Sequence, residues 1–185
     1  MSSVAVEKPK WSTRDMAYIA VFAVLIAVCS WISIPTTVPF TLQTFAVFVS
    51  VGLLGGRRGT LAVLVYILLG AVGIPVFAGF SGGIGILMST TGGYIIGFLG
   101  SALLYWAITA RFGAKTAVQA AAMVLGLVVC YAFGTLWFMQ VYARTSGPVG
   151  LTAALGWCVI PFIVPDLCKI ALALWMSRRL VRHVK

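Results

Sequence analysis

The chain has 185 residues, of which 62% are hydrophobic and 9% are charged, and its mean hydropathy is +1.10. Soluble domains carry about a quarter charged residues, so this composition excludes a soluble globular protein and predicts one that crosses a membrane several times. The net charge of +10 does not indicate nucleic-acid binding, because the basic residues lie between hydrophobic runs and not on a water-facing surface.

Apolar runs separated by polar residues, glycine and proline predict six transmembrane helices. They lie at residues 16–34, 43–54, 59–72, 92–109, 114–142 and 161–179. The second and third runs are short, so we expect tilt or local thinning of the membrane there. No small-residue cleavage site follows the first run, so we expect a span and not a signal peptide. The prediction is an all-α membrane protein, a compact bundle of six helices in one domain over residues 1–185.

The basic residues predict the orientation of the bundle. Eleven of the 13 Lys and Arg residues fall on one side if the chain crosses six times, and cytoplasmic connections collect such residues. We therefore expect both termini in the cytoplasm, with residues 1–14 as an N-terminal segment and residues 180–185 as a basic tail. A seventh span at residues 150–160 would put the tail outside, so we expect an external loop or a short surface helix there.

Two opposite charges, Asp166 and Lys169, interrupt the last hydrophobic run. A charge at membrane depth costs several kcal/mol unless it is paired or hydrated, and residues three apart share a helix face. Pro161 and Pro165 suit the opening turn of a helix, which predicts the pair in the outer half of the bilayer. Two interpretations are open: an ion pair that locks two helices, or a ligand site in which the carboxylate accepts and the ammonium donates hydrogen bonds.

Two polar segments lie between predicted helices. Thr41 and Gln43, just after Pro39, offer a hydroxyl and an amide to a ligand, although Thr41 could instead cap the next helix. Residues 75–85 contain four glycines and two aromatic residues, and such glycines permit close backbone approach to a ligand. From this segment and the helix after it, we take as candidate ligand contacts Phe77, Phe80, Ser81, Gly82 and Tyr94; a plain flexible loop is the alternative.

Two helices carry stripes of small residues, which allow close helix contacts in lipid. The stripes are Ala20, Ala23 and Ala27 in the first helix and Gly93, Gly97 and Ser101 in the fourth. Packing within the chain is one interpretation, and docking of another membrane subunit on the alanine face is the other.

The sequence lacks the residues that several kinds of chemistry require. The chain has one histidine, and its four cysteines lack the spacing of a metal site or redox pair. Three acidic residues give no partnered carboxylates for acid–base catalysis. The segment at Gly113 lacks the second glycine of a phosphate-binding loop, so we expect no ATP hydrolysis by this chain. The prediction is a protein that is not an enzyme and has no metal or cofactor.

Four segments together resemble the BioY family, the biotin-specific S components of energy-coupling-factor (ECF) transporters. They are PFTLQT at 39–44, GAVGIPVFAGFSGG at 70–83, TGGY at 91–94 and PDLCK at 165–169. Many members read Gly-Pro where this chain has Ser89 and Thr90. The resemblance implies a six-helix bundle in the cell (inner) membrane of a prokaryote, which captures biotin from outside with high affinity. It also implies two kinds of partner, a transmembrane coupling (T) subunit and two cytoplasmic ATPases, although some members are reported to work without them.

The resemblance also assigns roles to the candidate residues. Asp166 would accept hydrogen bonds from the ureido N–H groups of biotin and Lys169 would donate to the ureido carbonyl. Rings at 77, 80 and 94 would cover the thiophane ring and valeryl chain, and the polar groups at 41, 43 and 81, with N–H groups of the glycine loop, would lie near the carboxylate. The opposite orientation, with Lys169 on the carboxylate, stays open. The family's A-x-x-x-A docking face for the coupling subunit matches Ala23 and Ala27. Rival functions are an S component for another vitamin and a stand-alone biotin carrier.

Overall fold

The computed structural model describes residues 12–36 and 38–184, and side chains up to residue 180. Of the predicted terminal segments, residues 1–11 and the side chains of 181–185 lie outside the described part. The elements are α1 (Thr13–Trp31), β1 (Ser33–Ile34), β2 (Phe40–Thr41), α2 (Gln43–Ala71), η1 (Ala78–Phe80), α3 (Ile84–Leu87), α4 (Gly92–Phe112), α5 (Thr116–Thr145), α6 (Leu151–Cys158) and α7 (Ile160–Val184).

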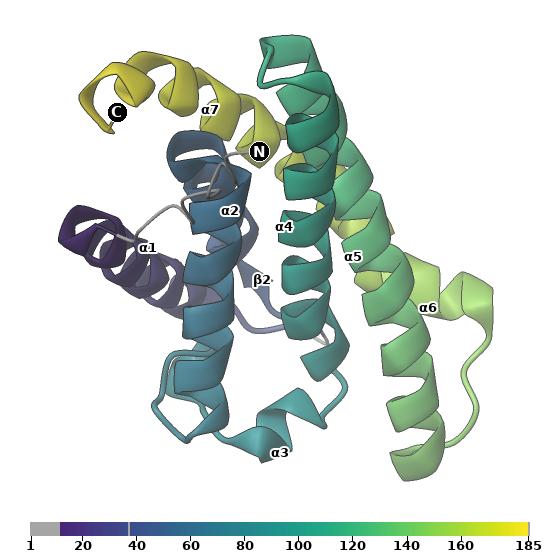
Figure 1. Ribbon diagram of the computed structural model, residues 1–185. Coiled ribbons are helices and arrows are strands. Elements are labelled where there is room, and N and C mark those ends of the chain that lie inside the picture. The colour runs from purple at the N-terminus through teal and green to yellow at the C-terminus, as the bar shows by residue number, and fades with distance from the viewer. Residues whose placement is uncertain (1–11, 37, 185) are drawn as a thin grey trace, which may run out of the picture.

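The chain is mostly helical, and five of its described helices are long and apolar enough to cross a membrane: α1, α2, α4, α5 and α7. Figure 1 shows α2, α4 and α5 side by side, with α7 running obliquely across one end of the group. For residues 150–160 we expected either an external loop or a short surface helix, and the structure has a short helix there, α6.

The two short helices predicted at 43–54 and 59–72 form one element, α2, which is broken at Gly55. Gly55 has φ 80° and ψ 166°, a conformation that glycine adopts at no steric cost. The two arms of α2 then run back along each other, since Gln43 Nε2 donates to Tyr66 Oη at 2.9 Å. Closer to the bend, a Cβ on Gly59 would lie 2.5 Å from Val51 Cα. The break therefore makes a tight helical hairpin.

The first helix ends at Trp31, three residues before the predicted end. Ser33 and Ile34 instead form β1, which pairs antiparallel with Phe40 and Thr41 of β2. Pro35 explains the difference, because a residue before proline is disfavoured in the helical region. This small ribbon brings the start of α2 back beside the end of α1.

The small-residue stripe of α4 packs against α5. A Cβ on Gly93 would lie 2.3 Å from Trp137 Cβ, and one on Gly97 would lie 3.0 Å from Cys130 Sγ. Ser101 Oγ donates to the backbone oxygen of Gly126 at 2.6 Å. Packing within the chain is thus the role of this stripe.

The alanine stripe of α1 requires a correction. Ala23 and Ala27 are 1% and 5% exposed, in a helix that packs on α2, so these two alanines are covered by the chain itself and present no face for another subunit. Of the three, only Ala20 is exposed. The stripe indicated correctly that something packs closely on it, but the partner is α2.

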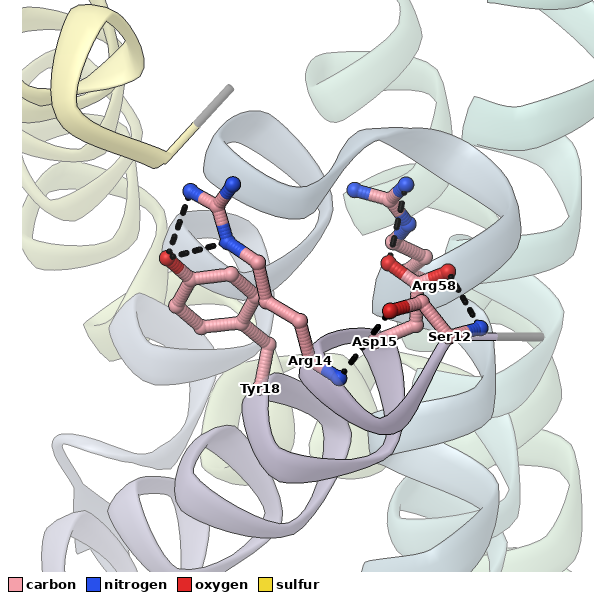
Figure 2. A network of polar contacts seen from close by, with 5 residues as sticks. All are labelled: Ser12, Arg14, Asp15, Tyr18 and Arg58. Carbon is pink, nitrogen blue, oxygen red and sulfur yellow. Dashed lines mark hydrogen bonds and ion pairs between the residues drawn. The ribbon is translucent and has the colours of Figure 1, made fainter.

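A polar network joins the start of α1 to the bend of α2 (Figure 2). Asp15 pairs with Arg58 at 2.9 Å and accepts a hydrogen bond from the backbone N–H of Ser12, whose hydroxyl accepts from the N–H of Arg14. The Arg14 guanidinium donates to Tyr18 Oη at 3.1 Å. The network caps α1 and ties it to the α2 hairpin.

Replacing Asp15 with Ala is expected to lower the free energy of unfolding by about 1 kcal/mol, because a helix cap and a partly exposed ion pair are both lost. Thermal unfolding in detergent measures this loss. Asp15→Asn, which keeps an oxygen acceptor for the cap, should lose less. Equal losses in the two variants would assign the whole effect to the ion pair, and no loss in either would contradict the prediction.

Candidate ligand-binding site

A cavity with a volume of about 140 Å³ lies where the loops meet α4, α5 and α7. Most of its lining is apolar or aromatic, with a few polar groups, which is typical of a small-molecule site. The lining residues are Val38, Pro39, Thr41, Gln43, Thr44, Phe77, Ala78, Ser81, Ile86, Thr91, Tyr94, Ile95, Phe98, Leu127, Cys130, Tyr131, Cys158, Phe162, Asp166 and Lys169.

Asp166 and Lys169 are the charged residues of this lining, and both are buried, at 3% and 8% exposure. Lys169 Nζ lies 2.7 Å from Asp166 Oδ1. The pair lies on one turn of α7, so it does not by itself bridge two helices. A buried pair of this kind is stable only when further hydrogen bonds satisfy the two groups.

Those further bonds come from two other elements. Tyr131 of α5 donates its hydroxyl to Asp166 Oδ2 at 2.7 Å, and Lys169 Nζ donates to the backbone oxygen of Thr41 in β2 at 2.7 Å. The ammonium also lies 4.2 Å from the centre of the Phe40 ring, a favourable cation–π distance. The pair is therefore held from both sides and adds no net charge to the cavity.

The polar groups at the start of α2 have partners as well. Thr41 Oγ1 accepts from the backbone N–H of Gln43 at 3.2 Å, so this hydroxyl satisfies the first N–H of α2, although the N-cap residue is Leu42, which has no side-chain cap bond. The amide of Gln43 bonds Tyr66 through one hydrogen, which leaves its carbonyl oxygen and second N–H for other partners. Farther round the cavity, Tyr94 Oη and Thr135 Oγ1 are 3.0 Å apart.

Seven of the nine residues predicted to contact a ligand line this one cavity. They are Asp166, Lys169, Thr41, Gln43, Phe77, Ser81 and Tyr94. Phe77 is 1% exposed and packs edge-on against Tyr66, with 5.6 Å between the ring centres. The structure thus brings together residues from β2, α2, the loop before α3, α4 and α7, which lie far apart in the sequence.

Phe80 and Gly82 lie outside the cavity lining. Phe80 has φ 55°, which turns its ring away, so that it is 66% exposed and stacks on Trp31 with 5.0 Å between ring centres. Gly82 is needed for close packing of the backbone, because a Cβ there would lie 2.4 Å from the Ile74 oxygen. The loop glycines therefore shape the loop, and Phe77 is the aromatic residue that the loop contributes to the cavity.

Several lining residues were not among the predicted contacts, and those with a polar side-chain group are Thr44, Thr91, Cys130, Tyr131 and Cys158. Tyr131 carried a usable signal, since it is the first hydrogen-bonding side chain after Gln119 in the long apolar run of α5, apart from the thiol of Cys130. Burial raises the pKa of the Cys158 thiol, so it lines the cavity as a neutral, weakly polar group.

The chain is similar over nearly its whole length to known transporters. Residues 4–185 match the sequence model of the BioY family. The biotin transporter BioY of Thermotoga maritima is 40% identical over 168 residues, which cover 90% of this chain and 95% of the relative. The biotin transporter BioY of Rhodobacter capsulatus is 34% identical over 180 residues, which cover 92% of this chain and 94% of the relative.

A solved structure has the same fold. The S-component for biotin from an ECF-type ABC transporter matches with a TM-score of 0.81 at 24% sequence identity, over 94% of this chain and 95% of that one. The family match over residues 4–185 and the 40% identity to the Thermotoga maritima relative show that this chain belongs to the BioY family.

Proposed function

We propose that this chain captures biotin with high affinity from outside the cell, as the substrate-binding S component of an ECF-type importer. Its relatives are named biotin transporters, and its cavity offers the groups that biotin needs. We propose a role in transport without a catalytic step.

The Asp166–Lys169 pair is the observation that carries this proposal. In a cyclic urea an N–H donor and the carbonyl acceptor lie side by side. Asp166 Oδ1 and Lys169 Nζ, 2.7 Å apart, offer an acceptor and a donor side by side in an apolar cavity, which complements that edge. Such a match favours the ureido ring over an isolated carboxylate, because the pair has no net charge with which to attract an anion.

The rest of the ligand would lie along the remaining lining. Phe77 and Tyr94 are the proposed contacts of the thiophane ring and valeryl chain, as large apolar surfaces of the cavity. Thr41, Gln43 and Ser81 are the proposed polar partners of the carboxylate. In the reverse orientation, Lys169 would instead hold the carboxylate.

The proposed topology has six spans, with the two arms of α2 crossing separately and both termini in the cytoplasm. Arg57 and Arg58 follow the α2 bend, Arg111 and Lys115 flank the α4–α5 turn, and Arg178 lies near the end of α7. In Figure 1 these three places lie toward one end of the molecule, and a basic end is typical of the cytoplasmic side. We place the chain in the prokaryotic cell (inner) membrane.

Uptake in this proposal requires a transmembrane coupling subunit and two cytoplasmic ATPases, which are the partners that the family resemblance implies. The sequence has no phosphate-binding loop, so the ATPase activity would come from these partners. A face of α1 that includes the exposed Ala20, Val24 and Val28 is our candidate contact for the coupling subunit. If liposomes that contain this chain alone accumulate biotin, the function is instead that of a stand-alone carrier.

Calorimetric titration of the detergent-purified chain tests the proposal. We expect biotin to saturate one site per chain, and thiamine and riboflavin to give no binding heat. Thiamine would bring the fixed positive charge of its thiazolium into an apolar cavity, and the three fused rings of riboflavin are larger than the two fused rings of biotin. Binding of another vitamin in place of biotin would assign the chain to a different substrate. No binding of any of the three would remove the proposal.

A further inference from the structure

Tyr131 reaches the charged pair from a different helix. It lies on α5, is half-buried and lines the cavity, while Asp166 lies on α7. The O–H···Oδ2 distance of 2.7 Å is that of a strong bond to a charged acceptor. This bond therefore connects α5 to the carboxylate at the ligand site.

The bonds to Asp166 restrict how its carboxylate can turn. A carboxylate has two oxygens with about two acceptor positions each. Lys169 occupies one position on Oδ1 and Tyr131 occupies one on Oδ2. With one donor on α7 and the other on α5, rotation of the carboxylate would break at least one bond. One acceptor position per oxygen stays available for a ligand.

Lys169 on its own would not fix this orientation. Its ammonium is held by the backbone oxygen of Thr41, but it contacts Oδ1 alone, so the carboxylate could still turn about that single bond. Tyr131 is anchored by its rigid ring on another helix and has a single donor hydrogen. The direction of the carboxylate relative to the cavity therefore depends on Tyr131.

We propose that Tyr131 is a positioning residue for ligand recognition: it holds the Asp166 carboxylate so that a free acceptor position faces the ureido N–H of the ligand. This inference rests on the proposed function, because it takes the ureido N–H as the partner of Asp166. It assigns to Tyr131 an effect on affinity that acts through Asp166 and not through contact with the ligand.

Tyr131→Phe removes the hydroxyl and keeps the ring. We expect it to lower the affinity for biotin about tenfold, the loss that follows from one hydrogen bond to a charged group. Tyr142→Phe is the matched control, because it removes a hydroxyl from the same helix, where the ring stacks on Phe138 away from the cavity. The control should bind biotin like the parent.

Two comparisons separate positioning from a general structural role. In an Asp166→Ala background, Tyr131→Phe should cause no further loss of affinity. With a biotin analogue methylated on both ureido nitrogens, Tyr131→Phe should cause no loss either, because no N–H is left for Asp166 to accept; this second comparison needs no Asp166 variant. Competition against labelled biotin, up to millimolar ligand, measures each affinity.

The outcomes distinguish this inference from the proposed function. If the parent binds biotin but Tyr131→Phe binds it equally well, the inference fails and the function stands. Equal losses for biotin and the dimethylated analogue would show a structural role and also overturn the inference. If the parent itself fails to bind biotin, the proposed function fails first.

Discussion

Replacing Asp166 with Asn is expected to lower the affinity for biotin about 100-fold while the protein stays folded. The amide keeps the size of the side chain, but the carboxylate that pairs with Lys169 at 2.7 Å is lost. In our proposal a ligand N–H donates to this carboxylate; a hydrogen bond to a charged group contributes about 1.5–3 kcal/mol, and each 1.4 kcal/mol corresponds to about a factor of ten. Calorimetric titration measures the affinity, and thermal unfolding in detergent measures the fold.

The matched control lies between the two charges. Cys168 is exposed and does not line the cavity, so Cys168→Ala should change neither affinity nor stability.

Lys169→Met, in contrast, leaves a buried carboxylate with only Tyr131 as donor. It should lower the free energy of unfolding by about 3–5 kcal/mol, in addition to lowering the affinity for biotin. The double variant Asp166→Asn/Lys169→Met should regain stability and still bind weakly. Binding like the parent in the double variant would reduce the pair to a structural role.

Gly59→Ala is expected to destabilise the protein by about 3 kcal/mol through overpacking of the α2 hairpin. The added Cβ would lie 2.5 Å from Val51 Cα and 2.8 Å from Val51 N. These are backbone atoms, so no change of side-chain conformation relieves the contact, and the two arms must separate. Chemical and thermal unfolding in detergent report the loss.

Gly100→Ala is the matched helical control. Its added Cβ would meet only Val129 Cγ1, at 3.6 Å, which is ordinary contact. Because alanine favours a helix over glycine by about 1 kcal/mol, this variant should be as stable as the parent or more so. If Gly59→Ala were equally harmless, the close approach of the two arms would not be needed for the fold.

The charged pair was predictable because its chemistry is unusual where it occurs. Asp166 and Lys169 interrupt an apolar run. The free-energy cost of placing a charge at membrane depth is enough to identify such residues as paired or functional. The α2 break was predictable for a similar reason, since Gly55 and Gly56 lie beside two arginines between apolar runs. Both features are local anomalies that need no knowledge of the fold.

Residues whose role depends on direction were harder to predict. Tyr131 is an ordinary residue in a long helix, and only the packing of α5 against α7 turns its hydroxyl toward Asp166. Phe80 was expected at the ligand because of its neighbours, but positive φ values at Gly79 and Phe80 turn its ring to the outside. Likewise, Ala23 and Ala27 signalled close packing without saying on what. Sequence patterns identify residues that need a hydrogen-bond, charge or packing partner, whereas the tertiary fold determines which residue that partner is.

The internal neutrality of the Asp166–Lys169 pair has a consequence for energetics in an energised membrane. A single charge that crosses the membrane potential gains or loses about 2.3 kcal/mol per 100 mV. Opposite charges 2.7 Å apart move together and sum to zero, so any movement of the pair across the potential does almost no electrical work on the pair. The pair itself would then add no voltage dependence to uptake, which would depend on the charge of the ligand and of the other charged residues of the protein.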